Sequence, residues 1–506
     1  MELKIFRDTL PQAGADCTAK AELPLETEIL ISDYLPPVFK LVKCFAKPVV
    51  LQKQLQPGRL TLEGYLRCTA FYQGEGDAGL CQTEQKLPFT RQLEVPDAPY
   101  TSWMAMVEGQ TEYLNCRAVT PRRIEVRGAF GLLVTLRTQH QTEVITALAD
   151  GGIEQRLQTL SGVRSAAVVE KLVAAEGELL FAKPPAAVLD ITGNASVREV
   201  KLLSGKAVVK GEIRVQCAWR AEGETSLQNQ AAALPFQQVV DMNGVTEDCK
   251  CLCVLEPVGF TLTEGEQDTE SQLTASVLMH LHAWRPFQLQ TVSDAFSTQF
   301  ETRITAQPTA VEQLVCMLNE TSTATVSGPL PDAGAQLRAC FVSYGPVQAV
   351  MAEDGGVLVA RAVATALAEN SLGELESYEK TMEFRFPLSA DDLQDAQLSA
   401  ECWLTTENVQ CSCSGGTLEV TVTARAEGAV LCRRVRNGIG SIELGDALTV
   451  PDPEVSLRIY YAQTGEELFS IARRFHVSPS RMMEANGLDA GTQILTQAQY
   501  FLIPGA

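Results

Sequence analysis

Two landmarks that recur at one fixed spacing constrain this chain more than any other feature of its sequence. The runs Gly58–Gly64 and Gly205–Gly211 each place five residues with alternating apolar positions between two glycines, and they lie 147 residues apart. The triplets Leu87–Phe89 and Leu234–Phe236, both Leu-Pro-Phe, keep the same separation without a gap. Because both landmarks stay in register, the sequence predicts tandem copies of one structural unit.

A third and more divergent copy follows. Residues 355–361 and the triplet Phe384–Phe386 both lie 297 residues after their counterparts in the first copy. A period of about 150 residues is much longer than that of solenoid repeats, and 506 residues are more than one hydrophobic core supports. Each copy is therefore expected to form a domain with its own core.

Every copy contains runs in which apolar and polar residues alternate, each followed by a polar turn. Examples are residues 60–71, 207–219 and 357–368. Such runs predict half-buried antiparallel strands, and the repeated glycines are expected at bends or bulges of these strands. Several strands in units of about 100 residues indicate a mainly β fold, with three tandem β-sandwich or open-barrel domains rather than a βαβ fold.

The landmarks also predict domain limits. These are 1–140, 160–290 and 310–440 for the three repeats, and 455–505 for a separate C-terminal module. Residues 151–178 and 291–319 are more polar and partly helical in composition. They are interpreted as connectors, where the chain passes from one core to the next.

The C-terminal module has a helical instead of a strand period. Leu468, Ile471, Ala472 and Phe475 are spaced as on one face of a helix, and a short strand at 457–462 precedes them. The sequence therefore predicts a strand followed by an amphipathic helix that packs on it.

A second helix has its own start and stop signals. Ser478 supplies an N-cap and Pro479 a first-turn proline, and the pair Asn486–Gly487 ends the helix. His476, directly after the first helix, is interpreted as a left-handed cap. With a closing strand before Pro504, the order strand–helix–helix–strand predicts a small α+β (βααβ) domain.

The composition excludes several classes of partner. Forty-five per cent hydrophobic and 20% charged residues are typical of a globular chain. Forty-one basic and 62 acidic residues give a net charge of −21, so no nucleic-acid partner is expected. No apolar run reaches the roughly 18 residues of a transmembrane segment. The first residues lack a basic region followed by an apolar one, which argues against a signal peptide and for a cytoplasmic protein.

The cysteine and histidine patterns predict no metal site and no cofactor. The 15 cysteines are scattered, so reduced thiols are expected. Cys249, Cys251 and Cys253 alternate along one strand face, where small apolar side chains belong, and they lack the CxxC pairs of a zinc site. His280 and His282 also share one strand face and are interpreted as polar-face residues.

No catalytic motif is present either. The chain has four histidines and no GxSxG, P-loop or HExxH pattern. Acid pairs such as Glu466-Glu467 are abundant in a chain of this charge, so abundance does not make them a general acid and base. The sequence predicts a protein that is not an enzyme.

The C-terminal module resembles a LysM domain over nearly its whole length. The resemblance is carried by residues 461–465, 468–475, 486–488 and 502–504. LysM domains generally bind glycans containing N-acetylglucosamine in a shallow groove between the loop after the first strand and the segment after the second helix. The resemblance implies a groove, for a glycan or a protein partner, formed by Gly465, Glu466, Glu467, Leu468, Phe469, Asn486, Gly487, Leu488 and Ile494.

The module departs from the LysM pattern at two places. The usual Gly-Asp-Thr/Ser is here Gly465–Glu467, which puts two long carboxylates at the mouth of the groove. The usual Pro-Gly-Gln before the last strand is replaced at residues 496–499. Both changes favour a protein over a neutral sugar, because carboxylates at a rim suit the Lys or Arg side chains of a partner.

The upstream repeats resemble SPOCS domains, the β-rich modules of spore-coat morphogenetic proteins. The resembling stretches are residues 119–127 and 200–212 together with the Leu-Pro-Phe triplets. SPOCS repeats followed by one C-terminal LysM domain are the architecture of SipL-like spore-coat proteins. That family implies a scaffold in the mother-cell cytoplasm, at the forespore surface and spore coat. Its LysM domain would bind the coat-basement ATPase SpoIVA, and other coat proteins would be further partners.

Three functions compete at this point. The first is a coat-morphogenesis scaffold that presents protein-binding surfaces. The second is a protein whose LysM domain holds peptidoglycan or another glycan with N-acetylglucosamine. The third, an enzyme such as a wall hydrolase, lacks a nucleophile–base set in the sequence. The missing signal pattern favours the scaffold, because a cytoplasmic chain does not meet the cell wall.

Overall fold

The computed structural model describes residues 3–76, 79–221, 228–265, 267–352, 355–388, 397–449, 457–489 and 493–504. These residues are mostly in strands, with two short helices in the C-terminal module. No helix in the described ranges is long and apolar enough to cross a membrane. The mainly β class predicted from the alternating runs is confirmed.

The strands fall into three successive groups, here called repeats 1, 2 and 3. Repeat 1 comprises β1 (Lys4–Ala13), β2 (Cys17–Leu30), β3 (Val38–Gln56), β4 (Arg59–Gly74), β5 (Leu80–Glu94), β6 (Ser102–Thr120) and β7 (Arg123–Ala149). Repeat 2 comprises β8 (Ile153–Leu180), β9 (Pro185–Leu203), β10 (Lys206–Ala221), β11 (Gln228–Asp241), β12 (Lys250–Glu264) and β13 (Glu270–Ser297). Repeat 3 comprises β14 (Phe300–Pro329), β15 (Gln336–Ala352), β16 (Gly355–Glu369), β17 (Leu375–Pro387), β18 (Gln397–Ser414) and β19 (Thr417–Ala447). The C-terminal module comprises β20 (Leu457–Ala462), α1 (Leu468–Phe475), α2 (Pro479–Asn486) and β21 (Gln499–Pro504).

Each repeat consists of two antiparallel sheets with the same strand order. One sheet is a simple meander, β3-β4-β5, β9-β10-β11 or β15-β16-β17. The other places the last strand of the repeat between the first strand and the one before last, as in β8-β13-β12 and β14-β19-β18. In repeat 1 the first strand is split into β1 and β2, and both pair with β7. The divergent third copy predicted from the sequence therefore has the topology of the other two.

The two sheets of each repeat enclose one hydrophobic cluster between them. Repeats 1, 2 and 3 each have their own cluster of buried residues, drawn from both of their sheets. This is sandwich packing, in which alternate residues of facing strands point inward. Each predicted domain contains one such pair of sheets. The predicted domain limits fall inside the long strands β7, β8, β13, β14 and β19. We retain the division into tandem domains as a proposal.

Gly58 and Gly205 lie in the turns before β4 and β10, with φ values of 71° and 73°. Gly64 and Gly211 lie at irregular positions of the meander sheets, as expected. Gly64 is opposite Phe89, and Gly211 is opposite Phe236, so the two landmarks are cross-strand neighbours in repeats 1 and 2. A register shift in the neighbouring strand occurs beside each glycine. A Cβ at Gly64 would lie 2.0 Å from the carbonyl oxygen of Val49, so only glycine fits there.

The interpretation of residues 151–178 and 291–319 as connectors was wrong. They form β8, the end of β13 and most of β14, which are among the longest strands of the chain. Their polar composition has a physical reason. The ends of these strands leave the sandwiches as two-stranded ribbons, in which fewer positions are buried than in a sandwich.

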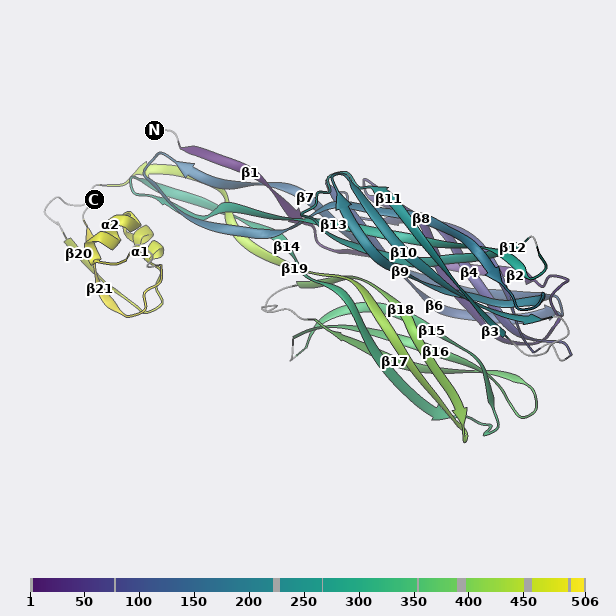
Figure 1. The fold of residues 1–506 in the computed structure, drawn as a ribbon. Coiled ribbons are helices and arrows are strands. Elements are labelled where there is room, and N and C mark those ends of the chain that lie inside the picture. Colours follow the sequence, from purple (N-terminus) through teal and green to yellow (C-terminus); the bar gives the residue numbers. More distant parts are fainter. Residues whose placement is uncertain are drawn as a thin grey trace.

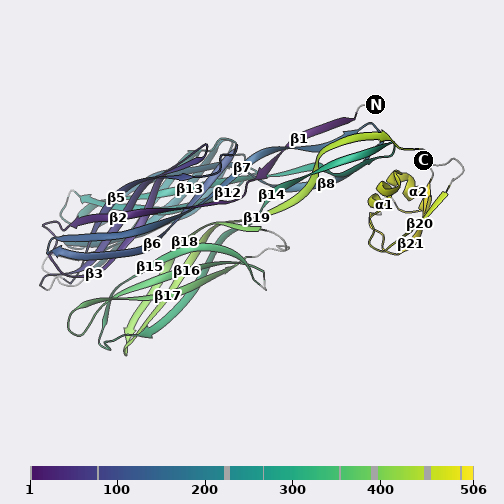
Figure 2. The ribbon, with the colours of Figure 1, turned by 180° about the vertical axis from the view of Figure 1, so that it is seen from behind.

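Three such ribbons, one from each repeat, run side by side as a stalk. The stalk consists of β1 with the end of β7, the start of β8 with the end of β13, and the start of β14 with the end of β19. Its tip has a small core to which every repeat contributes two residues, namely Ile145, Leu148, Val292, Ala295, Ile439 and Ile442. Figures 1 and 2 show the stalk between the sandwiches and the C-terminal module.

Candidate functional site

The C-terminal module forms around its two predicted helices. β20 and β21 pair antiparallel, and α1 and α2 cover one side of the pair. The Ser478 hydroxyl accepts a hydrogen bond from Arg481 N at 3.3 Å, as expected of an N-cap. His476 and Gly487 end the helices with φ values of 53° and 62°, which confirms both predicted caps.

The two segments that the resemblance assigns to the groove lie next to each other. The loop at 465–468 and the segment 493–495 exchange three backbone hydrogen bonds. Gly465 N donates to Leu495 O at 2.8 Å, and Leu495 N donates to Glu466 O at 3.0 Å. Glu467 and Ile494 are directly opposite each other. These two segments are therefore fixed relative to each other in the isolated chain.

Three of the predicted groove residues are used inside the module itself. Leu468 is 3% exposed and belongs to the hydrophobic core. The Asn486 side chain donates to Met482 O and Leu502 O, both at 2.8 Å, and accepts from Leu502 N at 2.7 Å. It thereby joins α2 to β21. The Glu466 carboxylate accepts hydrogen bonds from Tyr460 Oη at 2.8 Å and from Gln463 N at 3.1 Å.

Two more predicted groove residues contact the tip of the stalk. Glu467 forms an ion pair with Arg156 of β8. Phe469 packs edge-on against Phe296 of β13, with ring centroids 5.2 Å apart, and the Arg156 guanidinium lies over the same ring at 5.7 Å. Phe296 is 1% exposed and is part of the hydrophobic core of the module.

Polar contacts surround this apolar one. The Arg473 guanidinium donates to both oxygens of Asp294, at 2.9 and 3.0 Å. A ring nitrogen of His476 lies 3.0 Å from Ser297 O. Together these residues attach one side of α1 to the end of the repeat 2 ribbon. The module is therefore docked on the stalk, not only tethered to it.

The remaining predicted residues face solvent. Gly465, Gly487 and Ile494 are exposed, Ile494 by 56% of its side chain, and Leu488 is half-buried against the core of the module. The free part of the groove thus consists of two glycines, one large aliphatic side chain and the edge of another.

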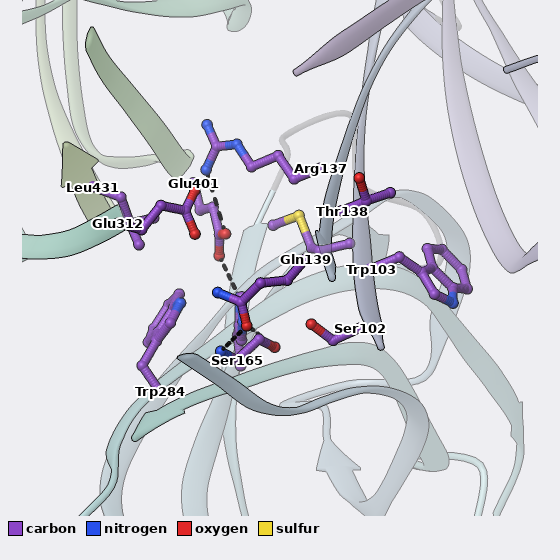
Figure 3. Close-up of a pocket in the computed structure, with 12 residues that line it drawn as sticks. Ser102, Trp103, Arg137, Thr138, Gln139, Ser165, Trp284, Glu312, Glu401 and Leu431 are labelled. Carbon is purple, nitrogen blue, oxygen red and sulfur yellow. Dashed lines mark hydrogen bonds and ion pairs between the residues drawn. The ribbon is translucent and has the colours of Figure 1, made fainter. Parts of the chain in front are cut away.

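A second polar site lies where the three repeats meet, and the sequence did not reveal it. His282 of β13 lies 2.8 Å from Glu401 of β18 through one ring nitrogen, and 2.9 Å from the Ser165 hydroxyl of β8 through the other. Arg137 of β7 reaches the Glu401 carboxylate at 3.4 Å. Figure 3 shows Arg137, Ser165 and Glu401 converging from different strands, with Glu312 beside Glu401. We call Arg137, Ser165, His282, Glu312 and Glu401 the junction cluster.

Burial governs the charges of the junction cluster. Glu401 is 1% exposed. Burial alone would raise its pKa, but His282 and Arg137 lower it, so the carboxylate stays ionised. Glu312 has no such close partner, and burial raises its pKa. A buried charge that is paired on two sides holds both partners in place, because losing either one leaves an uncompensated ion.

The Ser165–His282–Glu401 order has the hydrogen bonding of a nucleophile, a base and an acid. The sequence had suggested no such set. Attack by a serine also requires N–H donors for the developing oxyanion. The N–H of Ser165 itself already donates to Gln139 Oε1 at 2.9 Å. Glu401 is also neutralised by Arg137. The geometry favours a structural role at the contact of three repeats.

His280, two residues earlier, forms a second buried cluster between repeats 1 and 2. Its ring nitrogens lie 3.1 Å from Glu170 and 3.5 Å from Glu256. Lys53 of repeat 1 reaches the same Glu170 carboxylate. Burial alone would raise the pKa of Glu170, but its hydrogen bonds with His280 and Lys53 lower it to about 2. The two histidines interpreted as polar-face residues therefore both bind carboxylates at buried contacts between repeats.

No group of three or more His, Cys, Asp or Glu residues suited to a metal ion occurs in the described ranges. The 15 cysteines are free thiols, and Cys251 and Cys253 of the alternating run pack against the core of repeat 2. Burial raises the pKa of Cys251 to about 12. The packing role predicted for this run agrees with these contacts.

Comparison with known protein families gives two matches. The family model described as SipL, SPOCS domain, matches residues 37–119 and 186–261, which span β3 to β6 and β9 to β12. It matches no segment of repeat 3. The LysM domain model matches residues 460–496, from β20 to the second groove segment. No curated protein and no solved structure matches the chain. The matches give two SPOCS segments followed by one C-terminal LysM domain, which is the domain order expected of a SipL-like protein.

Proposed function

We propose that this chain is a non-enzymatic scaffold of the spore coat that docks through its LysM domain on the ATPase SpoIVA at the forespore surface. The SPOCS and LysM matches support a sporulation-related coat protein. The observation that carries the docking proposal is the position of the LysM domain. It lies at the end of the stalk, away from the sandwiches, where a large partner can approach it (Figure 1).

The chemistry of the exposed groove supports a protein partner. Its apolar contact is Ile494, and the carboxylates at its rim are Glu466, held by Tyr460, and Glu467, held by Arg156. A neutral sugar needs donors and acceptors at fixed places, whereas this combination suits a basic side chain beside an apolar anchor. Other coat proteins are proposed as partners of the acidic repeats on the same electrostatic ground.

Docking on the stalk makes the proposal testable in a specific way. Glu467 is paired with Arg156, so a partner that binds Glu467 must displace this arginine. Arg156→Ala should then speed association with SpoIVA, while Glu467→Lys should slow it, most strongly at low salt. If Glu467 serves only the stalk contact, both variants release the LysM domain and change association in the same direction.

The experiment uses the full-length chain and immobilised SpoIVA, with association and dissociation rates measured at several salt concentrations. Glu484→Lys makes the same charge change on an exposed position of α2 and should leave the rates unchanged. Ile494→Ala should raise the dissociation rate about five-fold, because exposed apolar anchors act on complex lifetime. Unchanged rates in Glu467→Lys and Ile494→Ala would contradict the proposed groove.

A glycan remains the second candidate, because the LysM match includes both groove segments. A pull-down of the full chain with insoluble peptidoglycan decides between the two. Saturable binding that Ile494→Ala weakens would favour peptidoglycan, and no binding beside a measurable SpoIVA complex would favour the scaffold.

A further inference from the structure

The two sheets of each repeat meet along one side without backbone pairing. In repeat 1, the outer strands on this side are β3 of the meander sheet and β6 of the other sheet. Within the described residues β3 pairs only with β4, and β6 only with β7. The corresponding strands are β9 and β12 in repeat 2, and β15 and β18 in repeat 3. We call this side the seam, and side chains alone hold it together.

A pair of cysteines bridges the seam of repeat 1. Cys44 on β3 and Cys116 on β6 are both half-buried against the core of repeat 1, and β3 and β6 are the edge strands that contact each other across the seam. The Cys116 thiol, followed by burial, raises the pKa of Cys44, and the Cys44 thiol lowers the pKa of Cys116. Two such thiols on facing edge strands are placed for a disulfide to form between them.

The seam of repeat 3 carries the same pair. Cys340 on β15 and Cys411 on β18 are half-buried against the core of repeat 3, and β15 and β18 contact each other across the seam. The Cys411 thiol lowers the pKa of Cys340, and the Cys340 thiol raises the pKa of Cys411. The positions correspond in the fold. Cys44 and Cys340 each lie opposite an alanine of the central meander strand, and Cys116 and Cys411 each lie opposite a valine of the last strand of the repeat.

Repeat 2 lacks the pair and provides an internal comparison. Ile191 of β9 faces Cys217, which is 147 residues after Ala70, the partner of Cys44. Ile191 thus occupies the place of Cys44, and β9 contains no cysteine. The cysteines of repeat 2 lie on β10, on β12 and just before β12. Paired thiols at the seam are therefore specific to repeats 1 and 3.

We propose that Cys44–Cys116 and Cys340–Cys411 are oxidation sites, at which a small-molecule disulfide converts each dithiol to a disulfide that joins the two sheets across the seam. One thiolate of the pair attacks the small disulfide and displaces one small thiol, which leaves a mixed disulfide on the protein. The second thiolate attacks the protein sulfur of that intermediate and displaces the other small thiol. Each pair loses two electrons and two protons, and the small disulfide becomes two thiols.

The structure gives each oxidation a defined consequence. The seam has no ladder hydrogen bonds, so a disulfide there would keep the two sheets from separating. It would also restrict the unfolded chain, which stabilises the folded state. Repeats 1 and 3 would become more resistant to heat, whereas repeat 2 would not change. All four cysteines are partly exposed, so a small disulfide can reach them.

The test is disulfide mapping of the full-length chain after equilibration with reduced and oxidised glutathione. Free thiols are alkylated, the chain is digested with trypsin, and the peptides are identified by mass spectrometry. Under oxidising conditions the peptide with Cys44 should be joined to that with Cys116, and the peptide with Cys340 to that with Cys411. Cys217 and Cys253 of repeat 2 should be alkylated. Four thiols should be lost, and the melting temperature should rise by several degrees.

Variants separate the proposed pairs from their neighbours. Cys411→Ser should abolish the link in repeat 3, while Cys413→Ser, a half-buried cysteine of the same strand, should leave it intact. The wild-type map decides the proposal even if a variant fails to fold. Alkylated Cys44 and Cys340 in oxidised glutathione alone would overturn it, and so would links from these residues to other cysteines.

Discussion

The three repeats and the LysM domain are joined to their neighbours in different ways. Between repeats, buried carboxylates are held by histidine, lysine and arginine from other repeats, as in the junction cluster around Glu401. Apolar clusters such as the one around Trp284 and Leu431 add to these contacts. The LysM domain contacts the stalk through one buried phenylalanine and ion pairs that are partly exposed. The contacts between repeats are more deeply buried than those of the LysM domain, so the LysM domain is expected to separate from the stalk before the repeats separate from one another.

The largest effect is expected for Glu401→Ala. The change leaves His282 and Arg137 without their buried carboxylate and should lower the free energy of unfolding by about 3–5 kcal/mol. The matched control is Glu374→Ala. Glu374 also joins two repeats, through Lys40, but its side chain is 48% exposed, so a cost of about 0–1 kcal/mol is expected. Equal losses in urea unfolding of the two variants would remove the distinction between buried and exposed contacts.

The next largest effect is expected for Phe296→Ala. Phe296 belongs to the stalk by sequence and to the LysM core by packing, so its loss should cost up to about 3 kcal/mol of docking. Small-angle X-ray scattering should show a larger maximum dimension when the LysM domain is released. The melting of the repeats should stay unchanged. An unaltered scattering profile would mean that the polar contacts suffice to hold the domain.

The stability of the contact between repeats 1 and 2 should depend on pH. Burial alone would lower the pKa of His280, but Glu170 and Glu256 raise it, and the pKa of Glu170 is about 2. The stabilisation from His280 is complete below its unfolded pKa of about 6.5 and is lost as the pH rises through the raised folded value. The stabilisation from Glu170 is complete above its unfolded pKa of about 4.3 and is lost as the pH falls towards 2.

The contact of repeats 1 and 2 should therefore be most stable between about pH 4.5 and 6.5. Urea unfolding of the full chain across pH 3 to 9 measures this window. His280→Gln should remove the decline on the alkaline side and keep most of that on the acid side. A decline that persists unchanged in His280→Gln would assign it to other groups.

A smaller effect is expected from the exposed ion pair of the LysM contact. Arg156→Glu and Glu467→Arg should each weaken docking, and the double variant should restore it with a coupling of about 0.2–1 kcal/mol. The maximum dimension from small-angle X-ray scattering provides the measurement. No restoration in the double variant would mean that Phe469 and Phe296 alone determine the geometry.

The smallest effect concerns Ser165. If the junction cluster is structural, a fluorophosphonate probe should not label Ser165, because its N–H donates to Gln139 and is not available to an oxyanion. Mass spectrometry of the treated chain checks this, with a serine hydrolase as positive control. Labelling that Ser165→Ala abolishes would turn the cluster into a catalytic site and end the non-enzymatic proposal.

The elements that the sequence revealed are those with a local cause. Alternation along 60–71 or 207–219 depends on one strand and its two faces, and the caps at Ser478 and Gly487 depend on a few adjacent residues. The polar ribbons of the stalk are strands that no such local pattern revealed. Few positions of these ribbons are buried, so their sequence is too polar to indicate a strand of the core.

The site residues were harder to predict for a related reason. Leu468 was known to fit a helix face, and its burial follows from that spacing alone. The partner of Glu467, in contrast, is 311 residues away, and the partner of His282 is 119 residues away. Nothing in a local pattern specifies such contacts. A signal for His280 and His282 did exist, since two histidines inside the otherwise apolar stretch 277–284 of β13 require buried polar partners.

The stalk also has a mechanical consequence. The LysM domain is attached to the end of β19, and β19 pairs with β14 from one end of the stalk to the far end of repeat 3. The hydrogen bonds of this ladder run perpendicular to the strands. A pull on the LysM domain away from the repeats therefore loads many bonds at once in shear, instead of opening them one after another. The stalk can therefore carry tension between the LysM domain and the repeats.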